Sequence, residues 1–86
     1  MAKVEIYTAM MCPFCTRAVS LLKRKGVNYK EVDVTFSPKQ RKAMAQRAGQ
    51  RSVPQIWIND DHVGGSDDLF ALDSAGKLDE MLAQSA

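Results

Sequence analysis

Long apolar runs are missing from this 86-residue sequence, and so is a large excess of charge of either sign. No run approaches the ~20 apolar residues that a membrane-spanning helix needs. The opening residues, MAKVEIY, reach a strand-like pattern too soon to leave space for a signal peptide. The net charge is only +2, and basic residues do not alternate with aromatic ones, which argues against nucleic-acid binding. We therefore expect a cytoplasmic monomer that binds neither membrane nor nucleic acid.

Cysteine and histidine are also scarce, since Cys12 and Cys15 are the only thiols and His62 is the only histidine. A structural zinc site needs about four such ligands, which disfavours one within a single chain. A disulfide between the two cysteines closes too small a loop to stabilise much, and a reducing cytoplasm would open it. Redox or thiolate chemistry is the favoured interpretation. A lesser alternative is an iron-sulfur cluster shared by two chains, because one chain has too few thiolates.

The composition, 45% hydrophobic and 26% charged, is ordinary for a globular protein and predicts one domain over residues 1–86. The charges are divided unevenly along the chain. From Arg17 to Arg51 there are ten Lys and Arg against two acidic residues, whereas from Ser52 to Ala86 there are seven acidic residues against one Lys. The two parts either form two solvated faces or serve a ligand of mixed charge.

Hydrophobic periodicity predicts an α/β fold. Four segments have strand patterns: residues 3–7, 28–34, 54–58 and 62–64. Three segments have helical patterns: residues 13–25, 38–48 and 66–84, the last interrupted at Gly76. The order β-α-β-α-β-β-α makes the first two strands parallel through a helical crossover and the last two an antiparallel hairpin. We expect a four-stranded mixed sheet flanked by helices.

Cys12 falls where the first predicted strand ends and the first helix begins. Backbone N–H groups and the positive end of the helix dipole favour thiolate over thiol at such a position, so Cys12 is the expected nucleophile. Pro13 suits the first helical turn, and Cys15 lies within reach of Cys12 for a disulfide. We expect Cys15 to be the shielded, resolving thiol. A C-x-x-C pair beside a βαβ pattern is typical of redox sites.

Three motifs follow one another along the chain: CPFC after the first strand, SVPQIWI about forty residues later, and GGSDDL close behind. Together they resemble the glutaredoxins, whose dithiol members usually carry CPYC, TVP and GG-x-x-D. The resemblance runs from Val4 to about Leu82. It implies a thioredoxin-like fold and a glutathione-dependent oxidoreductase that reduces glutathione mixed disulfides and protein disulfides. Glutathione would be the co-substrate, with no tightly bound cofactor or metal.

Two other functions stay open under this resemblance. A dimer could carry an iron-sulfur cluster held by Cys12 and bound glutathione. Alternatively, the chain could be a thiol-binding adaptor without catalytic activity. Visible absorbance would reveal the first, and a disulfide-reduction assay would exclude the second.

The resemblance also implies how the substrate's cysteine is held. Val53-Pro54 resembles the family's cis-proline turn, which would expose the N–H and C=O of Val53 beside Cys12. The backbone of a substrate cysteine would pair there like an added strand. Phe14 replaces the family's usual Tyr, so a possible substrate contact keeps its aromatic ring and loses its hydroxyl.

Glutathione has two carboxylates and one ammonium, and the resemblance assigns a partner to each. The helix that opens at Gly65, Ser66 and Asp67 would offer N–H donors to the γ-glutamyl carboxylate, and the Asp67 carboxylate would take the ammonium. For the glycyl carboxylate, Arg41 stands where the family often has Gln or Arg, and Arg51 is the weaker candidate. Either arginine could instead be a solvated surface charge.

Other positions near the motifs carry less information. Ala9 stands where many dithiol glutaredoxins have a lysine, so no cation immediately precedes the nucleophilic cysteine. Met10 and Met11 could give substrates a soft apolar platform, but we expect them to fill a loop or the core. We expect His62 to be a strand residue without a catalytic role and Trp57 to have a packing role.

Overall fold

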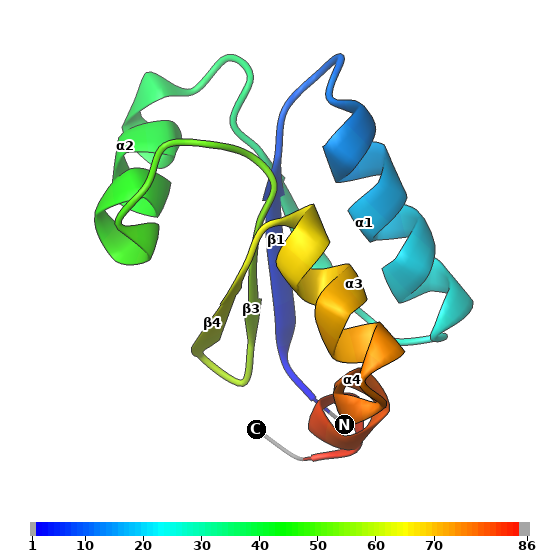
Figure 1. Cartoon of the computed structure of the whole chain (residues 1–86). Coiled ribbons are helices and arrows are strands. Elements are labelled where there is room, and N and C mark those ends of the chain that lie inside the picture. Colours follow the sequence, from blue (N-terminus) through cyan, green and yellow to red (C-terminus); the bar gives the residue numbers. More distant parts are fainter. Residues whose placement is uncertain (1, 85–86) are drawn as a thin grey trace.

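The computed structural model describes residues 2–84 and shows a four-stranded mixed sheet with helices on both faces (Figure 1). The strands are β1 (Val4–Thr8), β2 (Lys30–Asp33), β3 (Gln55–Ile58) and β4 (Asp61–Gly64). The helices are α1 (Pro13–Arg24), α2 (Pro38–Ala48), α3 (Ser66–Ser74) and α4 (Lys77–Ala83). The predicted order of elements is confirmed, including the break at Gly76 between α3 and α4.

The strands lie in the order β2-β1-β3-β4. β1 is parallel to β2 and antiparallel to β3, and β3 and β4 form an antiparallel hairpin, as predicted. The second strand is shorter than the predicted range 28–34, because its pairing with β1 begins at Lys30, opposite Glu5. The carboxyl end of β1 leads directly to Cys12 and α1.

The main core lies between the sheet and helices α1 and α3, which cover the same face in Figure 1. Alternate residues of β1 are buried, which is the period of a strand with one face in the core. α1 begins at Pro13, whose fixed φ suits the first helical turn, and it buries one apolar side. These contacts fix the start of α1 at the end of β1.

α2 covers the opposite face of the sheet (Figure 1). The Arg47 guanidinium lies 4.2 Å from the centre of the Trp57 ring, and it donates to both carboxylate oxygens of Glu5 at 3.1 Å. Met44 is fully buried under the same helix. Side chains near the end of α2 therefore hold it on the sheet. Within residues 2–84, no helix is both long enough and apolar enough to cross a membrane.

Candidate active site

Cys12 is the N-cap residue of α1. Its Sγ accepts a hydrogen bond from the Cys15 backbone N–H at 3.2 Å, and it is half-buried, so a substrate can reach it. The Val53 carbonyl lies 3.8 Å from the same sulfur. A backbone donor at a helix N-terminus stabilises a thiolate more than a neutral thiol, because hydrogen bonds to charged acceptors are stronger. Cys12 has the surroundings of a nucleophile.

Cys15 has a contrasting environment one helical turn away. Its side chain is only 4% exposed. Burial raises the pKa of the Cys15 thiol to about 12, and the hydrogen bond with Cys12 and the charges of Cys12 and Glu31 act in the same direction. A hydrogen bond from the Ala9 backbone opposes them only in part. Cys15 is therefore a neutral, shielded thiol at neutral pH, as expected for a resolving cysteine.

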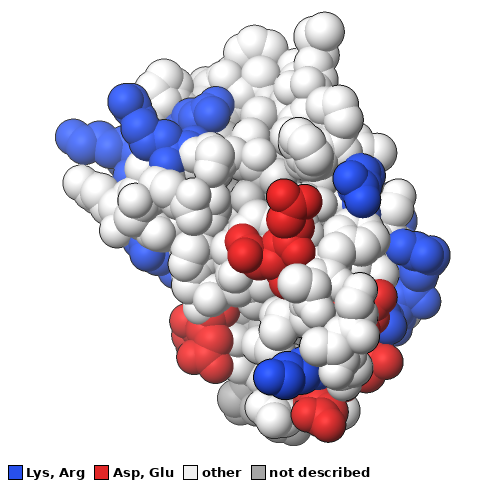
Figure 2. All heavy atoms as spheres, in the orientation of Figure 1, with Lys and Arg blue, Asp and Glu red and all other residues white. Residues whose placement is uncertain are grey.

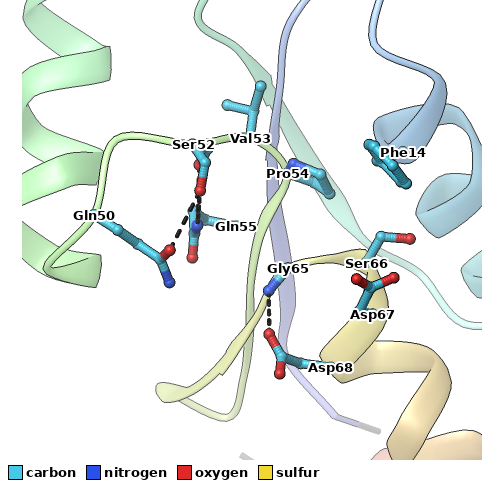
Figure 3. Close-up of a pocket in the computed structure, with 10 residues that line it drawn as sticks. All are labelled: Phe14, Gln50, Ser52, Val53, Pro54, Gln55, Gly65, Ser66, Asp67 and Asp68. Carbon is cyan, nitrogen blue, oxygen red and sulfur yellow. Dashed lines mark hydrogen bonds between the residues drawn. The ribbon is translucent and has the colours of Figure 1, made fainter.

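A hollow of about 230 Å³ lies beside the start of α1 (Figure 3). It brings together three distant segments: the first turn of α1, the loop before β3, and the first turn of α3. Its lining includes six residues predicted from the sequence, namely Phe14, Val53, Pro54, Gly65, Ser66 and Asp67. The Val53-Pro54 peptide bond is cis. The hollow thus has an apolar side at Phe14 and Pro54 and a polar side at α3.

The first turn of α3 forms this polar side. The Gly65 N–H donates to Asp68 Oδ2 at 2.9 Å. It is therefore already used within the protein, although the sequence predicted it as a donor to the ligand. The N–H groups of Ser66 and Asp67 belong to the first helical turn, where no intrahelical acceptor exists. In the part of the chain that the structure describes, the buried Ser66 hydroxyl has no partner. The first turn of α3 therefore presents N–H groups without an intrahelical acceptor beside the hollow.

Gly64 is needed just ahead of this turn. Its φ is +115°, and a Cβ there would clash with the Asp68 carboxylate. Gly64 thus permits Asp68 to cap the start of α3.

The two predicted arginines lie elsewhere. Arg41 and Arg51 line a second hollow against α2, where the Arg41 guanidinium donates to the Arg51 carbonyl at 3.3 Å. Figure 2 shows Lys and Arg gathered over α2 and acidic residues at the start of α3. Neither arginine lines the first hollow, which contains Ser66 and Asp67. They form a basic surface beside it.

Sequence reasoning missed part of the hollow's wall, namely Gln50, Ser52, Gln55 and Asp68. Gln55 is only 1% exposed, and its amide donates to the Ser52 carbonyl at 3.0 Å. The Gln55 Oε1 atom lies 2.7 Å from His62 Nε2, so His62 also supports this loop. Asp68 could have been found, because an acidic side chain three residues after an N-cap is a known capping pattern. The Gln55 contact with His62 joins β3 to β4, and nothing in the sequence next to Gln55 indicates it.

The methionines before Cys12 lie in the loop between β1 and α1 and do not fill the core. Met10 is 57% exposed and Met11 is 97% exposed, and both adjoin Cys12 at the surface. The Thr35 hydroxyl accepts from the Met10 N–H at 2.7 Å, which fixes the loop and leaves both side chains outside. Trp57 packs as expected, between the Tyr7 ring, the His62 ring and the Arg47 guanidinium.

Comparisons with known proteins agree with this geometry. The glutaredoxin family model matches residues 4–63. A probable glutaredoxin of Synechocystis is 58% identical over 82 residues, covering 94% of this chain and 93% of the relative. Glutaredoxin 3 of Escherichia coli is 49% identical over 82 residues, covering 95% and 99%.

A solved structure extends the comparison to three dimensions. The crystal structure of a buckwheat glutaredoxin-glutathione complex superposes with a TM-score of 0.86 at 27% identity, covering 94% of this chain and 76% of the other. The fold is therefore thioredoxin-like, as the motifs implied. The chain belongs to the glutaredoxin family of thiol oxidoreductases.

Proposed function

We propose that residues 1–86 act as one glutaredoxin domain that reduces glutathione mixed disulfides and protein disulfides in the cytoplasm. Glutathione is the electron donor in this proposal. The observation that carries it is the pair of thiols at the start of α1. Cys12 is accessible and accepts a backbone hydrogen bond, whereas Cys15 is buried and keeps its proton.

The reaction begins when the Cys12 thiolate attacks one sulfur of a glutathionylated protein. A bond forms between Cys12 and the glutathione sulfur, the original disulfide breaks, and the protein thiol leaves with the electron pair. A second glutathione thiolate then attacks the mixed disulfide on Cys12, which releases oxidised glutathione and restores the enzyme. On protein disulfides, Cys15 attacks instead and closes a Cys12-Cys15 disulfide, which glutathione later reduces.

The hollow beside Cys12 suits the γ-glutamyl end of glutathione. The N–H groups of Ser66 and Asp67 would bind its carboxylate at the helix terminus, and the Asp67 side chain would bind its ammonium. The backbone of Val53, whose carbonyl lies 3.8 Å from the Cys12 sulfur, would pair with the cysteinyl residue. The buckwheat complex supports glutathione as the ligand of this fold.

The opposite end of glutathione faces a different surface in this proposal. The glycyl carboxylate would extend toward the basic surface of α2, where Arg41 and Arg51 lie. Because both arginines are exposed, we expect each to contribute modestly.

A coupled assay tests the proposal. The purified protein is mixed with a glutathione mixed disulfide, reduced glutathione, glutathione reductase and NADPH, and NADPH consumption is followed. We expect catalysis well above the uncatalysed exchange. No acceleration by the intact protein would contradict the proposal and favour a thiol-binding adaptor.

A further inference from the structure

A third hollow, different from those at α3 and α2, adjoins Cys15 on the side of the sheet where α1 meets β1 and β2. Its volume is about 220 Å³, and its lining includes Cys15, Thr8, Lys23, Glu31 and Asp33. It shares none of its lining residues with the hollow that we assign to glutathione. This third hollow has no part in the proposed binding of glutathione. Its charged groups are therefore available for another role.

The chemistry of Cys15 creates a need for such a role. If the proposed function is correct, Cys15 must lose its proton before it can attack the mixed disulfide on Cys12. The pKa of the Cys15 thiol, raised to about 12 by burial, makes spontaneous ionisation rare at neutral pH. Cys15 has almost no exposed surface of its own. A proton acceptor reached through the hollow would remove this obstacle.

Three charged side chains line the hollow, and they differ in their ability to accept a proton. Lys23, from α1, is a cation and has no free electron pair to offer. Asp33, from β2, already accepts from the hydroxyl and the backbone N–H of Thr35, which lower the pKa of its carboxyl and make it a weaker base.

Glu31, also from β2, is the remaining carboxylate. It accepts the Thr8 hydroxyl at 2.8 Å, and Thr8 is only 3% exposed at the end of β1. Thr8 therefore holds the carboxylate of Glu31, an exposed residue of the edge strand β2, against the end of β1. A hollow of this size has room for water between the carboxylate and the thiol.

We propose that Glu31 accepts the proton of Cys15, through water in the hollow beside Thr8, when Cys15 closes the internal disulfide. The proton leaves Cys15 for the Glu31 carboxylate, and the Cys15 thiolate attacks the Cys12 sulfur. The Cys12-Cys15 bond forms as the bond from Cys12 to glutathione breaks. Glutathione leaves as a thiolate with the electron pair, and Glu31 later returns the proton to solvent.

A single-turnover experiment on the full chain tests this proposal. Reduced protein is mixed with oxidised glutathione, the reaction is quenched with acid at successive times, and mass spectrometry follows first the Cys12 mixed disulfide and then its closure. We expect Glu31→Gln to slow closure about a hundredfold at pH 7, the lower range for a positioned proton acceptor. Closure in the variant should also accelerate with pH more steeply than in the native protein, because hydroxide must then take the proton.

Three variants provide controls. Asp33→Asn removes the same charge from the same hollow and should leave closure within a few-fold of native. Glu31→Asp keeps a carboxylate and should restore part of the rate. In a Cys15→Ser background, adding Glu31→Gln should not change the reduction of glutathione mixed disulfides, because that route never uses Cys15.

The closure rates of the variants can also contradict the proposal. If Glu31 acted only through its charge, its removal would favour the Cys15 thiolate and speed closure, so equal or faster closure in Glu31→Gln overturns the proposal. Equal slowing by Asp33→Asn would likewise overturn it. Failure of the proposed function is distinguishable, since the Cys12 mixed disulfide would then not form in any variant.

Discussion

At the scale of single residues, two chemically identical thiols differ because of where the backbone places them. Cys12 caps a helix at the surface, and Cys15 lies one turn deeper, against the core. The spacing in the sequence was enough to predict this difference, since an N-cap followed by a proline sets the helix start locally. Burial raises the pKa of the Cys15 thiol most, followed by the hydrogen bond with Cys12, and the charge of Glu31 on β2 adds to them. The part played by Glu31 could not be predicted from the motif.

The ring of Phe14 is a second feature of single-residue scale. It is 53% exposed and lines the hollow beside Pro54. If it serves mainly as an apolar wall, Phe14→Tyr should change kcat/KM for a glutathione mixed disulfide by only a few-fold. A change above about a hundredfold, or ~2.7 kcal/mol in the barrier, would show that a hydroxyl at this position matters.

Ala9 marks a departure from many dithiol glutaredoxins, which have a lysine there. Ala9 lies beside Met10, Met11 and Cys12 at the surface. A cation introduced by Ala9→Lys should attract the glycyl carboxylate, so we expect a lower KM for glutathione. The matched control is Ala9→Met, which adds length without charge. An unchanged KM in Ala9→Lys would show that the missing lysine has no functional consequence.

We expect Arg41 to make only a small contribution to glutathione binding. Its side chain is exposed and lies in the hollow against α2, so solvent screens its charge. We expect Arg41→Ala to raise the KM for glutathione by less than about tenfold, with kcat little changed. Lys39→Ala, on the same helix outside that hollow, should have no effect. A loss of kcat with unchanged KM in Arg41→Ala would contradict a role in binding.

At the scale of elements, α2 depends on a few side chains for its attachment. Arg47 joins it to Trp57 by a cation–π contact and to Glu5 by a bidentate ion pair. We expect Arg47→Ala to lower the free energy of unfolding by about 1–3 kcal/mol at pH 7. Urea unfolding measures this loss, and Lys42→Ala on the same helix should cost little.

The same ion pair predicts a dependence on pH. The hydrogen bond from Arg47 lowers the pKa of the Glu5 carboxyl. A lowered pKa in the folded state stabilises the fold above the range in which Glu titrates in the unfolded chain, and this stabilisation is lost as the pH falls through the lowered value. The stability difference between native protein and Arg47→Ala should therefore shrink on acidification. A difference that stays constant from neutral to acid pH would contradict the ion-pair account.

The elements themselves were predictable because their signals are local. Period-2 alternation marked β1, and Ser37 followed by Pro38 marked the start of α2, where the Ser37 hydroxyl accepts the Gln40 N–H. The position of α2 across the sheet was not predictable, since it depends on Arg47 meeting Trp57. The exposure of Met10 and Met11 was not predictable for the same reason, because the loop that carries them is held by a hydrogen bond from the Met10 N–H to Thr35 on another loop.

At the scale of the whole molecule, the division of charge along the chain becomes a division across its surface. Basic residues gather over α2 and acidic ones at the start of α3 (Figure 2), where Asp67 and Asp68 line the hollow. A ligand with anionic ends and an ammonium can use both. This arrangement supports the interpretation that at least part of the charge serves a ligand rather than solvation alone.

The alternative of an iron-sulfur carrier also belongs to this scale, because it depends on how many chains assemble. One chain offers a single accessible cysteine, whereas a cluster needs about four sulfur ligands, so a carrier would require two chains and two glutathiones. We expect anaerobically purified protein with glutathione to be monomeric and to lack visible absorbance. A coloured dimer would support the cluster function instead.

The most direct test of the account compares Cys12→Ser with Cys15→Ser in two assays. One assay follows reduction of a glutathione mixed disulfide, and the other follows reduction of a protein disulfide. Because only Cys12 is accessible and accepts a backbone hydrogen bond at a helix N-terminus, Cys12→Ser should lose both activities. Cys15→Ser should keep the first and lose reactions that need the internal disulfide. Equal loss of mixed-disulfide reduction in the two variants would contradict the division of labour on which the account depends.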